Sequence, residues 1–178
     1  MNLEHSTPGT GGHQTDDFIA RQGPAFLAHL LRRLSDELVQ GAALWYPTMG
    51  VTAPPRTLST LIALDDLGPL GVTELARLLR QTHPLVITWI RELTSLSFVT
   101  TGSDQKDGRR SLIALTAKGR AEVRRVRAAL VGMEQASIRL LEQSGDGVLA
   151  ALWRMESACR DTPFADLLRQ SRGQERHD

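Results

Sequence analysis

The sequence predicts a mainly helical protein that carries one small two-stranded β-hairpin. Apolar residues recur at helical spacing along most of the 178-residue chain. The period changes to two only around residues 98–115, where two short runs flank a polar, glycine-containing loop. Apolar residues make up 41% of the chain and charged residues 23%, a composition that allows a globular protein with a buried core.

Composition excludes several classes of protein. A net charge of +1 excludes a polycation and an acidic disordered chain, and a single cysteine excludes a disulfide framework or a cysteine-rich zinc site. The chain has no apolar run long enough to span a membrane and no apolar core before Phe18, so we expect a soluble, cytoplasmic protein. Because the glycine motifs of nucleotide-binding proteins and the serine nucleophile elbow are also missing, we expect no enzyme, cofactor or metal site.

The N-terminal part predicts a flexible arm followed by a long helix. Residues 1–16 are rich in glycine, serine and threonine and contain few apolar side chains. From residue 17 to residue 47 the leucines follow helical spacing, and Pro47 with Gly50 ends the helix. The leucines of this stripe are Leu27, Leu30, Leu31, Leu34 and Leu38.

Three shorter helices are expected between residues 52 and 97. Thr52 is the expected N-cap of the first, Gly71 of the second and Thr82 of the third. The turn over residues 66–69 separates the first two helices. The expected inward positions are Val72, Leu75, Leu78 and Leu79 in the second helix and Val86, Ile90, Leu93 and Leu96 in the third.

The hairpin and the C-terminal helices follow. Residues 98–101 and 111–115 predict two strands, and Thr116 is the expected cap of a long helix. Residues 144–147 turn the chain into another helix, which Pro163 ends before a short turn at residues 164–168. Cys159 lies on the apolar stripe of that helix, which favours a buried, inert thiol. The long helix carries a heptad-like seam of Val123, Val126, Leu130, Met133, Ser137 and Leu140.

This order of elements is typical of a winged helix-turn-helix. The helix after the tight turn can enter the major groove of DNA, and the hairpin tip can carry arginines into the minor groove. The expected organisation is a flexible arm (1–16), an N-terminal dimerisation helix (17–47), a DNA-binding lobe (52–116), C-terminal dimerisation helices (117–170) and a flexible tail (171–178).

Residues from about 26 to 141 resemble the multiple-antibiotic-resistance regulator (MarR) family of winged-helix repressors. The order and spacing of five segments carry the resemblance, of which the loop with its following segment is the most specific. The segments are Gly50-Val51-Thr52-Ala53-Pro54-Pro55, Val72-Thr73-Glu74-Leu75-Ala76, Gln81-Thr82-His83-Pro84-Leu85-Val86, Asp104-Gln105-Lys106-Asp107-Gly108-Arg109-Arg110 and Leu115-Thr116-Ala117-Lys118-Gly119.

The resemblance implies a homodimer that binds a pseudo-palindromic operator in double-stranded DNA and represses transcription, with a small aromatic or phenolic effector that relieves binding. On the recognition helix, about residues 82–96, the candidate DNA-binding residues are Thr82, His83, Leu85, Thr88 and Arg91. On the wing they are Lys106, Asp107, Arg109 and Arg110, with Asp107 orienting the arginines. The candidate effector pocket is lined by Trp45, Tyr46 and Leu64.

Three positions depart from the family pattern and keep an alternative open. Ile87 and Trp89 stand where the family usually has smaller or polar residues, and Ser97 stands where a glycine commonly ends the recognition helix. Residues 52–116 hold seven basic and six acidic side chains, so no broad basic field exists. Ile87, Trp89 and the nearly neutral charge favour a winged-helix module that docks a protein partner. A third reading is an architectural DNA binder without an effector.

Overall fold

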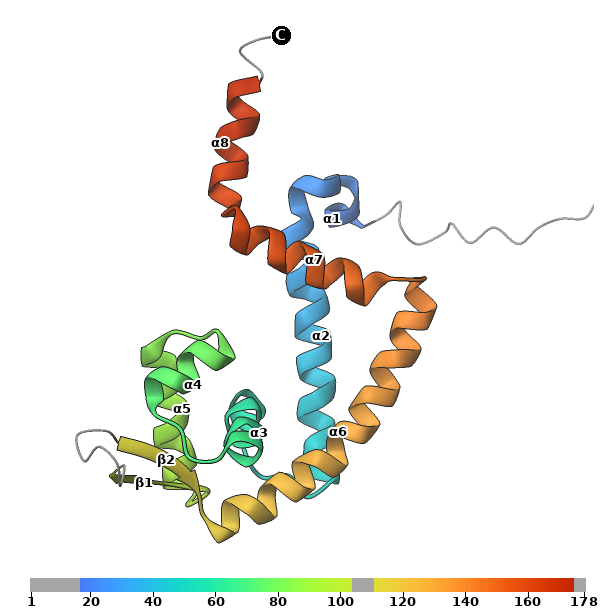
Figure 1. Cartoon of the computed structure of the whole chain (residues 1–178). Coiled ribbons are helices and arrows are strands. Elements are labelled where there is room, and N and C mark those ends of the chain that lie inside the picture. The colour runs from blue at the N-terminus through green and yellow to red at the C-terminus, as the bar shows by residue number, and fades with distance from the viewer. Residues whose placement is uncertain (1–16, 104–110, 175–178) are drawn as a thin grey trace, which may run out of the picture. The chain divides into compact units, whose positions relative to one another are not determined.

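The computed structural model describes residues 17–103 and 111–174, and most of them are helical (Figure 1). Contacts divide the chain into two units, residues 1–129 and 130–178. No helix in these two described ranges is both long and apolar enough to cross a membrane. The elements are α1 (Phe18–Arg21), η1 (Gly23–Phe26), α2 (Leu27–Thr48), η2 (Pro55–Thr57), α3 (Leu58–Leu67), α4 (Val72–Leu79), α5 (His83–Ser95), β1 (Val99–Ser103), β2 (Ser111–Leu115), α6 (Ala117–Ser144), α7 (Val148–Asp161) and α8 (Phe164–Gln174).

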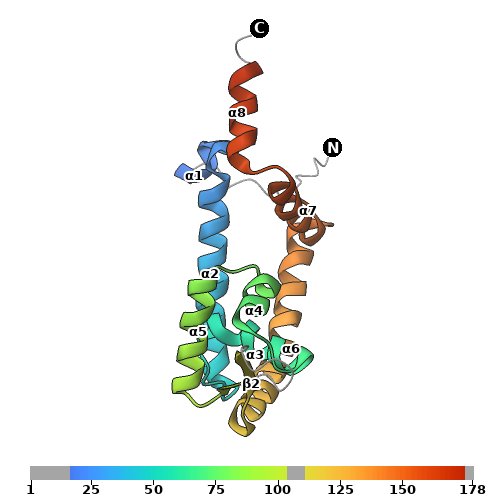
Figure 2. The same cartoon turned by 60° about the vertical axis from the view of Figure 1, so that its left-hand side comes forward.

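A compact lobe of the first unit is formed by α3, α4, α5 and the hairpin (Figures 1 and 2). The two strands pair antiparallel from Val99 opposite Leu115 to Ser103 opposite Ser111, as the change of period predicts. Leu70 forms an additional β-bridge that the sequence pattern does not predict. Its N–H donates to the Ile113 carbonyl, and its carbonyl accepts from the Ile113 N–H. The fully buried side chains of this lobe include Leu61, Leu75, Val86, Leu93, Phe98 and Ile113.

The helix expected to run continuously from residue 17 is interrupted, because the chain forms the short helices α1 and η1 before α2 begins. The Asp17 carboxylate caps α1 by accepting from the N–H groups of Ile19 (2.8 Å) and Ala20 (3.1 Å), and it also accepts from Arg33 at 2.7 Å. Gly23 then takes a positive φ of 61°, which ends the helical path, and Pro24 starts η1. The prediction of one helix over residues 17–47 is therefore wrong at its N-terminal end.

Thr52 does not cap a helix. Its N–H and hydroxyl both donate to the Glu122 carboxylate, and the next helix, α3, begins only at Leu58 after η2. The Thr52 hydroxyl, which an N-cap would use to accept from a helical N–H, instead donates to a side chain 70 residues away in sequence.

The predicted junction between the hairpin and α6 is confirmed. The Thr116 hydroxyl accepts from the Gly119 N–H at 3.0 Å, as an N-cap does. A Cβ atom built on Gly119 would lie only 2.0 Å from the Phe98 carbonyl oxygen. Glycine at residue 119 therefore lets α6 pass against the backbone that enters β1.

The C-terminal part differs from the prediction in three ways. The heptad-like seam is buried at Val123 and Val126, but Leu140 is 40% exposed. Cys159 is exposed, not buried. Residues 164–174 form the helix α8 instead of a short turn with a tail from residue 171.

Residues 1–16, expected to be an arm, lie outside the described residues.

Candidate nucleic-acid interface

The turn between α4 and α5 is built by local contacts. The Glu74 carboxylate accepts from the Gly71 N–H at 2.8 Å, which confirms Gly71 as the start of α4. Arg80 ends that helix in the left-handed conformation with φ of 52°, and the Gln81 N–H closes the turn on the Ala76 carbonyl at 2.9 Å. Thr82 then occupies the N-cap position of α5 in an extended conformation. The chain thus reverses within three residues and directs the start of α5 outward.

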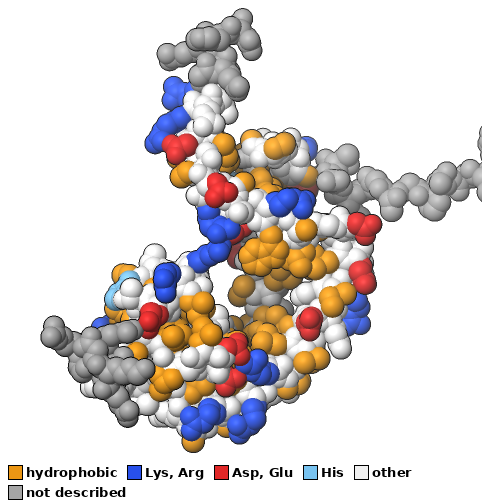
Figure 3. Space-filling view, in the orientation of Figure 1, with side chains coloured by type: hydrophobic (Ala, Val, Ile, Leu, Met, Phe, Trp, Pro, Cys, Tyr) orange, Lys and Arg blue, Asp and Glu red, His pale blue; other side chains and the backbone are white. Residues whose placement is uncertain are grey.

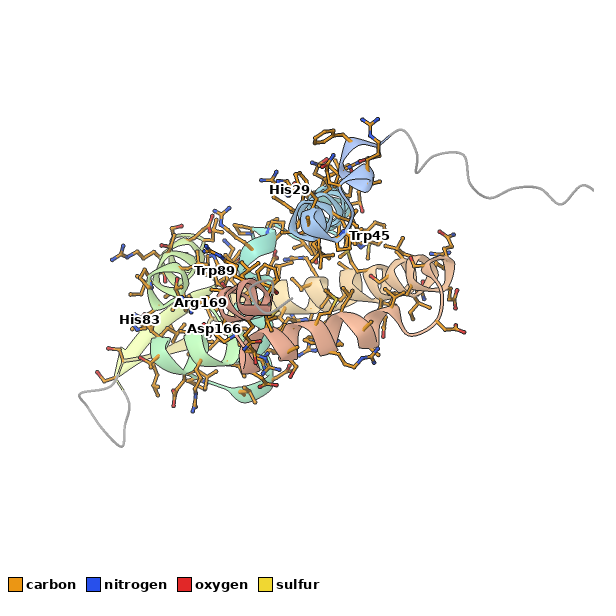
Figure 4. All side chains as sticks on the ribbon, turned by 90° about the horizontal axis from the view of Figure 1, so that it is seen from above. His29, Trp45, His83, Trp89, Asp166 and Arg169 are labelled. Carbon is orange, nitrogen blue, oxygen red and sulfur yellow. The ribbon has the colours of Figure 1, made fainter. Side chains whose placement is uncertain are left out.

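The candidate residues on the recognition helix lie on one exposed face. Thr82, His83, Leu85, Thr88 and Arg91 are all exposed, whereas Val86, Ile90 and Leu93 are buried on the opposite face. The Thr88 hydroxyl donates to the Pro84 carbonyl at 3.0 Å. His83 lies at the edge of the lobe in Figure 4, and its Nε2 is 3.5 Å from the Thr73 hydroxyl oxygen. Thr73 was missed because nothing in its local sequence signals contact with α5.

Trp89 does not belong to that face. Its side chain is 7% exposed and faces the core beside Ile90, and its indole N–H has no partner among the described residues. Its place on the helix faces inward, so the Trp89 indole is not part of the surface that α5 exposes. Ile87 is half-buried.

Ser97, which stands where the family pattern commonly has a glycine, adopts a left-handed backbone conformation. Ser97 has φ of 61°, a region that favours glycine. Its N–H donates to the Thr94 carbonyl at 2.9 Å, and its own carbonyl accepts from the Thr116 hydroxyl at 2.7 Å. The serine therefore makes the same turn that a glycine would make, at the cost of some backbone strain.

The wing candidates Lys106, Asp107, Arg109 and Arg110 lie outside the described residues. The structure describes both strands that lead to them, and Thr100, Thr101, Gly102 and Ser103 of β1 are exposed.

Charged side chains on the lobe are mostly paired. Arg56 donates to Glu92 on α5, with Nη2 and Oε1 2.5 Å apart, and Arg127 donates to both Asp65 (2.7 Å) and Asp66 (2.5 Å). These carboxylates hold the pKa of Arg127 above its usual value through hydrogen bonds. Basic and acidic side chains are interspersed on the face that Figure 3 shows. No group of three or more potential metal ligands exists within residues 17–103 and 111–174.

The three candidate effector-pocket residues have different surroundings. Trp45 is 37% exposed and donates its indole N–H to the Ala129 carbonyl at 3.0 Å (labelled in Figure 4), whereas Tyr46 and Leu64 are buried. Burial raises the pKa of the Tyr46 hydroxyl.

Comparison with known proteins gives similarities in structure. No protein-family model matches the sequence, and no curated protein matches it. A probable transcriptional regulator from Pseudomonas aeruginosa is 26% identical, with a TM-score of 0.60 over 74% of this chain and 95% of its own. MepR from S. aureus, solved in complex with DNA, is 27% identical, with a TM-score of 0.64 over 74% of this chain and 97% of its own.

A mutant MarR from E. coli, solved with operator DNA, is 18% identical, with a TM-score of 0.63 over 80% of this chain and 97% of its own. At that identity the similarity shows the fold alone. The helix-turn-helix, the paired strands and the similarity to known regulators together show that the chain has the winged-helix fold of MarR-type transcriptional regulators.

Proposed function

We propose that the protein is a homodimeric repressor that binds a pseudo-palindromic DNA operator through α5 and the hairpin. The observation that carries this proposal is the exposed face at the start of α5, which is backed by a fully packed core. The similarity to MepR, which was solved with DNA, supports it. The free N–H groups of the first turn of α5 offer phosphates hydrogen bonds and the positive end of the helix dipole.

Within this proposal the exposed residues have different roles. His83 and Thr82, at the N-terminus of α5, contact phosphates or base edges, and Thr88 and Arg91 lie one and two turns further along the same face. The exposed Leu85 side chain meets a thymine methyl group. Arg109 and Arg110, oriented by Asp107 and assisted by Lys106, bind the minor groove or its phosphates.

The dimer supplies the second recognition helix. Two copies of α5 must lie roughly 34 Å apart to read half-sites one helical turn apart. The proposed dimerisation segments are residues 17–47 and 117–170, which retain many exposed apolar side chains. An aromatic or phenolic effector bound near Trp45, Tyr46 and Leu64 would relieve repression by favouring a dimer state with weaker DNA affinity.

The test is a selection of genomic DNA fragments on the purified protein, followed by titration of the recovered sequence at low and physiological salt. Wild type is compared with Arg91→Ala, with the double variant Arg109→Ala, Arg110→Ala, and with Arg172→Ala as a control on the exposed surface of α8, outside the proposed dimerisation segments. We expect a palindromic sequence whose binding weakens steeply with salt, because phosphate contacts release counterions. The two test proteins bind more weakly, and the control does not.

The absence of any enriched sequence would contradict DNA binding and favour a module that docks a protein. Equal binding by wild type and all variants would contradict the roles given to Arg91, Arg109 and Arg110. The burial of Trp89 already removes one of the features that supported such a module. A titration of aromatic and phenolic acids against the DNA complex separates an effector-controlled repressor from an architectural binder, which shows no response.

A further inference from the structure

A buried carboxylate connects the lobe to α6. The Glu122 side chain is fully buried, and its Oε1 accepts from the Thr52 N–H at 2.5 Å, the Ala53 N–H at 2.7 Å and the Thr52 hydroxyl at 3.1 Å. Its Oε2 accepts from the Arg125 guanidinium at 2.7 Å. The carboxylate therefore has four hydrogen bonds, and three of them come from the segment that joins α2 to α3.

A buried carboxylate is a costly way to fill space between α6 and the segment before α3. Moving a carboxylate out of water costs several kcal/mol even in real proteins, and an apolar side chain of similar volume often serves a core as well or better. What the carboxylate adds is direction, since hydrogen bonds to two successive N–H groups fix the backbone of Thr52 and Ala53 in one orientation. An apolar contact would allow that segment to slide.

The first part of α6 also contacts the helices on both sides of this segment. The Ala129 carbonyl accepts from the Trp45 indole N–H at 3.0 Å, and residues 122 and 129 are two helical turns apart on one face, with the buried Val126 between them. Arg127 binds Asp65 and Asp66 at the other end of α3. The first part of α6 is therefore attached to the end of α2, to the connecting segment and to the end of α3.

We propose that Glu122 is a positioning residue for DNA binding, which fixes residues 50–53 on α6 and so sets the direction in which the lobe presents α5. The proposal rests on the proposed function, in which two copies of α5 must meet two half-sites at a defined separation. If the lobe could rotate at residues 50–53, the dimer would bind operators with several half-site separations at similar affinity. Glu122 thus restricts the operators that the dimer accepts.

The ionisation of Glu122 agrees with this role. Burial raises the pKa of the carboxyl, but hydrogen bonds from Thr52, Ala53 and Arg125 outweigh it and hold the pKa below the ordinary value. The group is therefore charged at neutral pH, when its hydrogen bonds to the backbone are strongest.

The test compares Glu122→Gln with wild type on the selected operator and on operators in which single base pairs are added or removed between the half-sites. Arg172→Gln, which removes one charge from an exposed side chain outside the proposed dimerisation segments, is the control. We expect Glu122→Gln to bind the original operator about tenfold more weakly and to discriminate less among the spacings. The control retains both the affinity and the discrimination. Hydrogen exchange of the Thr52 and Ala53 amides should become faster in Glu122→Gln only.

Measurements are made well below the melting temperature of each protein, after circular dichroism has verified helical content. If Glu122→Gln does not fold, Arg125→Gln and Thr52→Val each remove one contact and should change the spacing preference in the same direction. A Glu122→Gln protein that weakens all operators equally would overturn the proposal, because lost stability does not depend on spacing. Unchanged binding would also overturn it. Failure of wild type to bind any fragment overturns the proposed function, which separates the two results.

Discussion

The two units of this protein bury their apolar side chains to very different degrees, although α6 runs through both. Every buried residue of α6 lies in the first unit, and the last of them is Ala129. From Leu130 to Arg172, the last residue whose burial is described, no side chain is buried. The exposed large hydrophobic residues of the second unit include Ile138, Leu140, Leu149, Trp153, Phe164 and Leu168. Hydrophobic side chains lie uncovered on the face that Figure 3 shows.

This difference separates what one chain can stabilise from what it cannot. The first unit has a closed apolar core, so its lobe can keep its shape without a partner. The second unit has helices with many exposed large apolar side chains, which is a property of surfaces that bind another protein. We therefore propose that the second unit is completed by a second copy.

The largest expected effect on stability comes from adding a side chain where α6 passes against the backbone at Phe98. Gly119→Ala would place a Cβ atom against the Phe98 carbonyl, and backbone cannot yield as a side chain tip does. We expect a loss of about 3 kcal/mol or more in the free energy of unfolding, measured by urea denaturation. Gly41→Ala is the control, because it lies within α2 with nothing within 4 Å of the added Cβ. A loss no larger than that of the control would contradict the close approach.

A pair of substitutions on the seam of α6 tests the difference between the units directly. Val126→Ala removes a fully buried side chain and should cost about 2 kcal/mol at every protein concentration. Leu140→Ala truncates a 40% exposed side chain, so it should cost little in dilute protein and more where the dimer forms. Melting temperature and sedimentation velocity are measured over a hundredfold range of concentration. An equal loss of stability in the two variants at all concentrations would contradict the proposed difference between the two units.

A smaller effect is expected from acid. The pKa of Glu122 is below its ordinary value of 4.5 in the folded protein, so the carboxylate stabilises the first unit fully above about that pH. The stabilisation should be lost as the pH falls from there through the folded pKa. Urea unfolding of wild type and Glu122→Gln from pH 7 to pH 3 should give curves that converge in acid. A stability difference that stays constant over this range would show that the charge does not contribute.

The smallest expected effect is a gain. Ser97→Gly should relieve the left-handed strain at φ of 61° and stabilise the first unit by about 0.5–1 kcal/mol, with part of the gain offset by the greater freedom of glycine when unfolded. The change in melting temperature measures it, and Ser137→Gly in the interior of α6 should lower stability instead. A destabilised Ser97→Gly protein would indicate that the serine side chain matters more than the backbone.

Much of the lobe could be predicted from the sequence because its signals are local. Gly71 with Glu74 marks the start of α4, Thr116 marks the start of α6, and the period of two marks both strands. The exposed face of α5 also follows from helical spacing. The roles of Thr82, His83, Leu85, Thr88 and Arg91 in DNA binding stay predictions, as do those of the wing residues.

The order of the helices and the hairpin follows from local sequence, because caps, turns and periodicity act over a few residues. Tertiary structure alone decided that Thr52 bonds to Glu122, that Trp89 faces the core and that the seam of α6 is buried only as far as Ala129. Each of these depends on which distant segment lies beside the residue. Local sequence encodes the direction of a side chain on its own helix, but only the packed chain determines what that side chain meets.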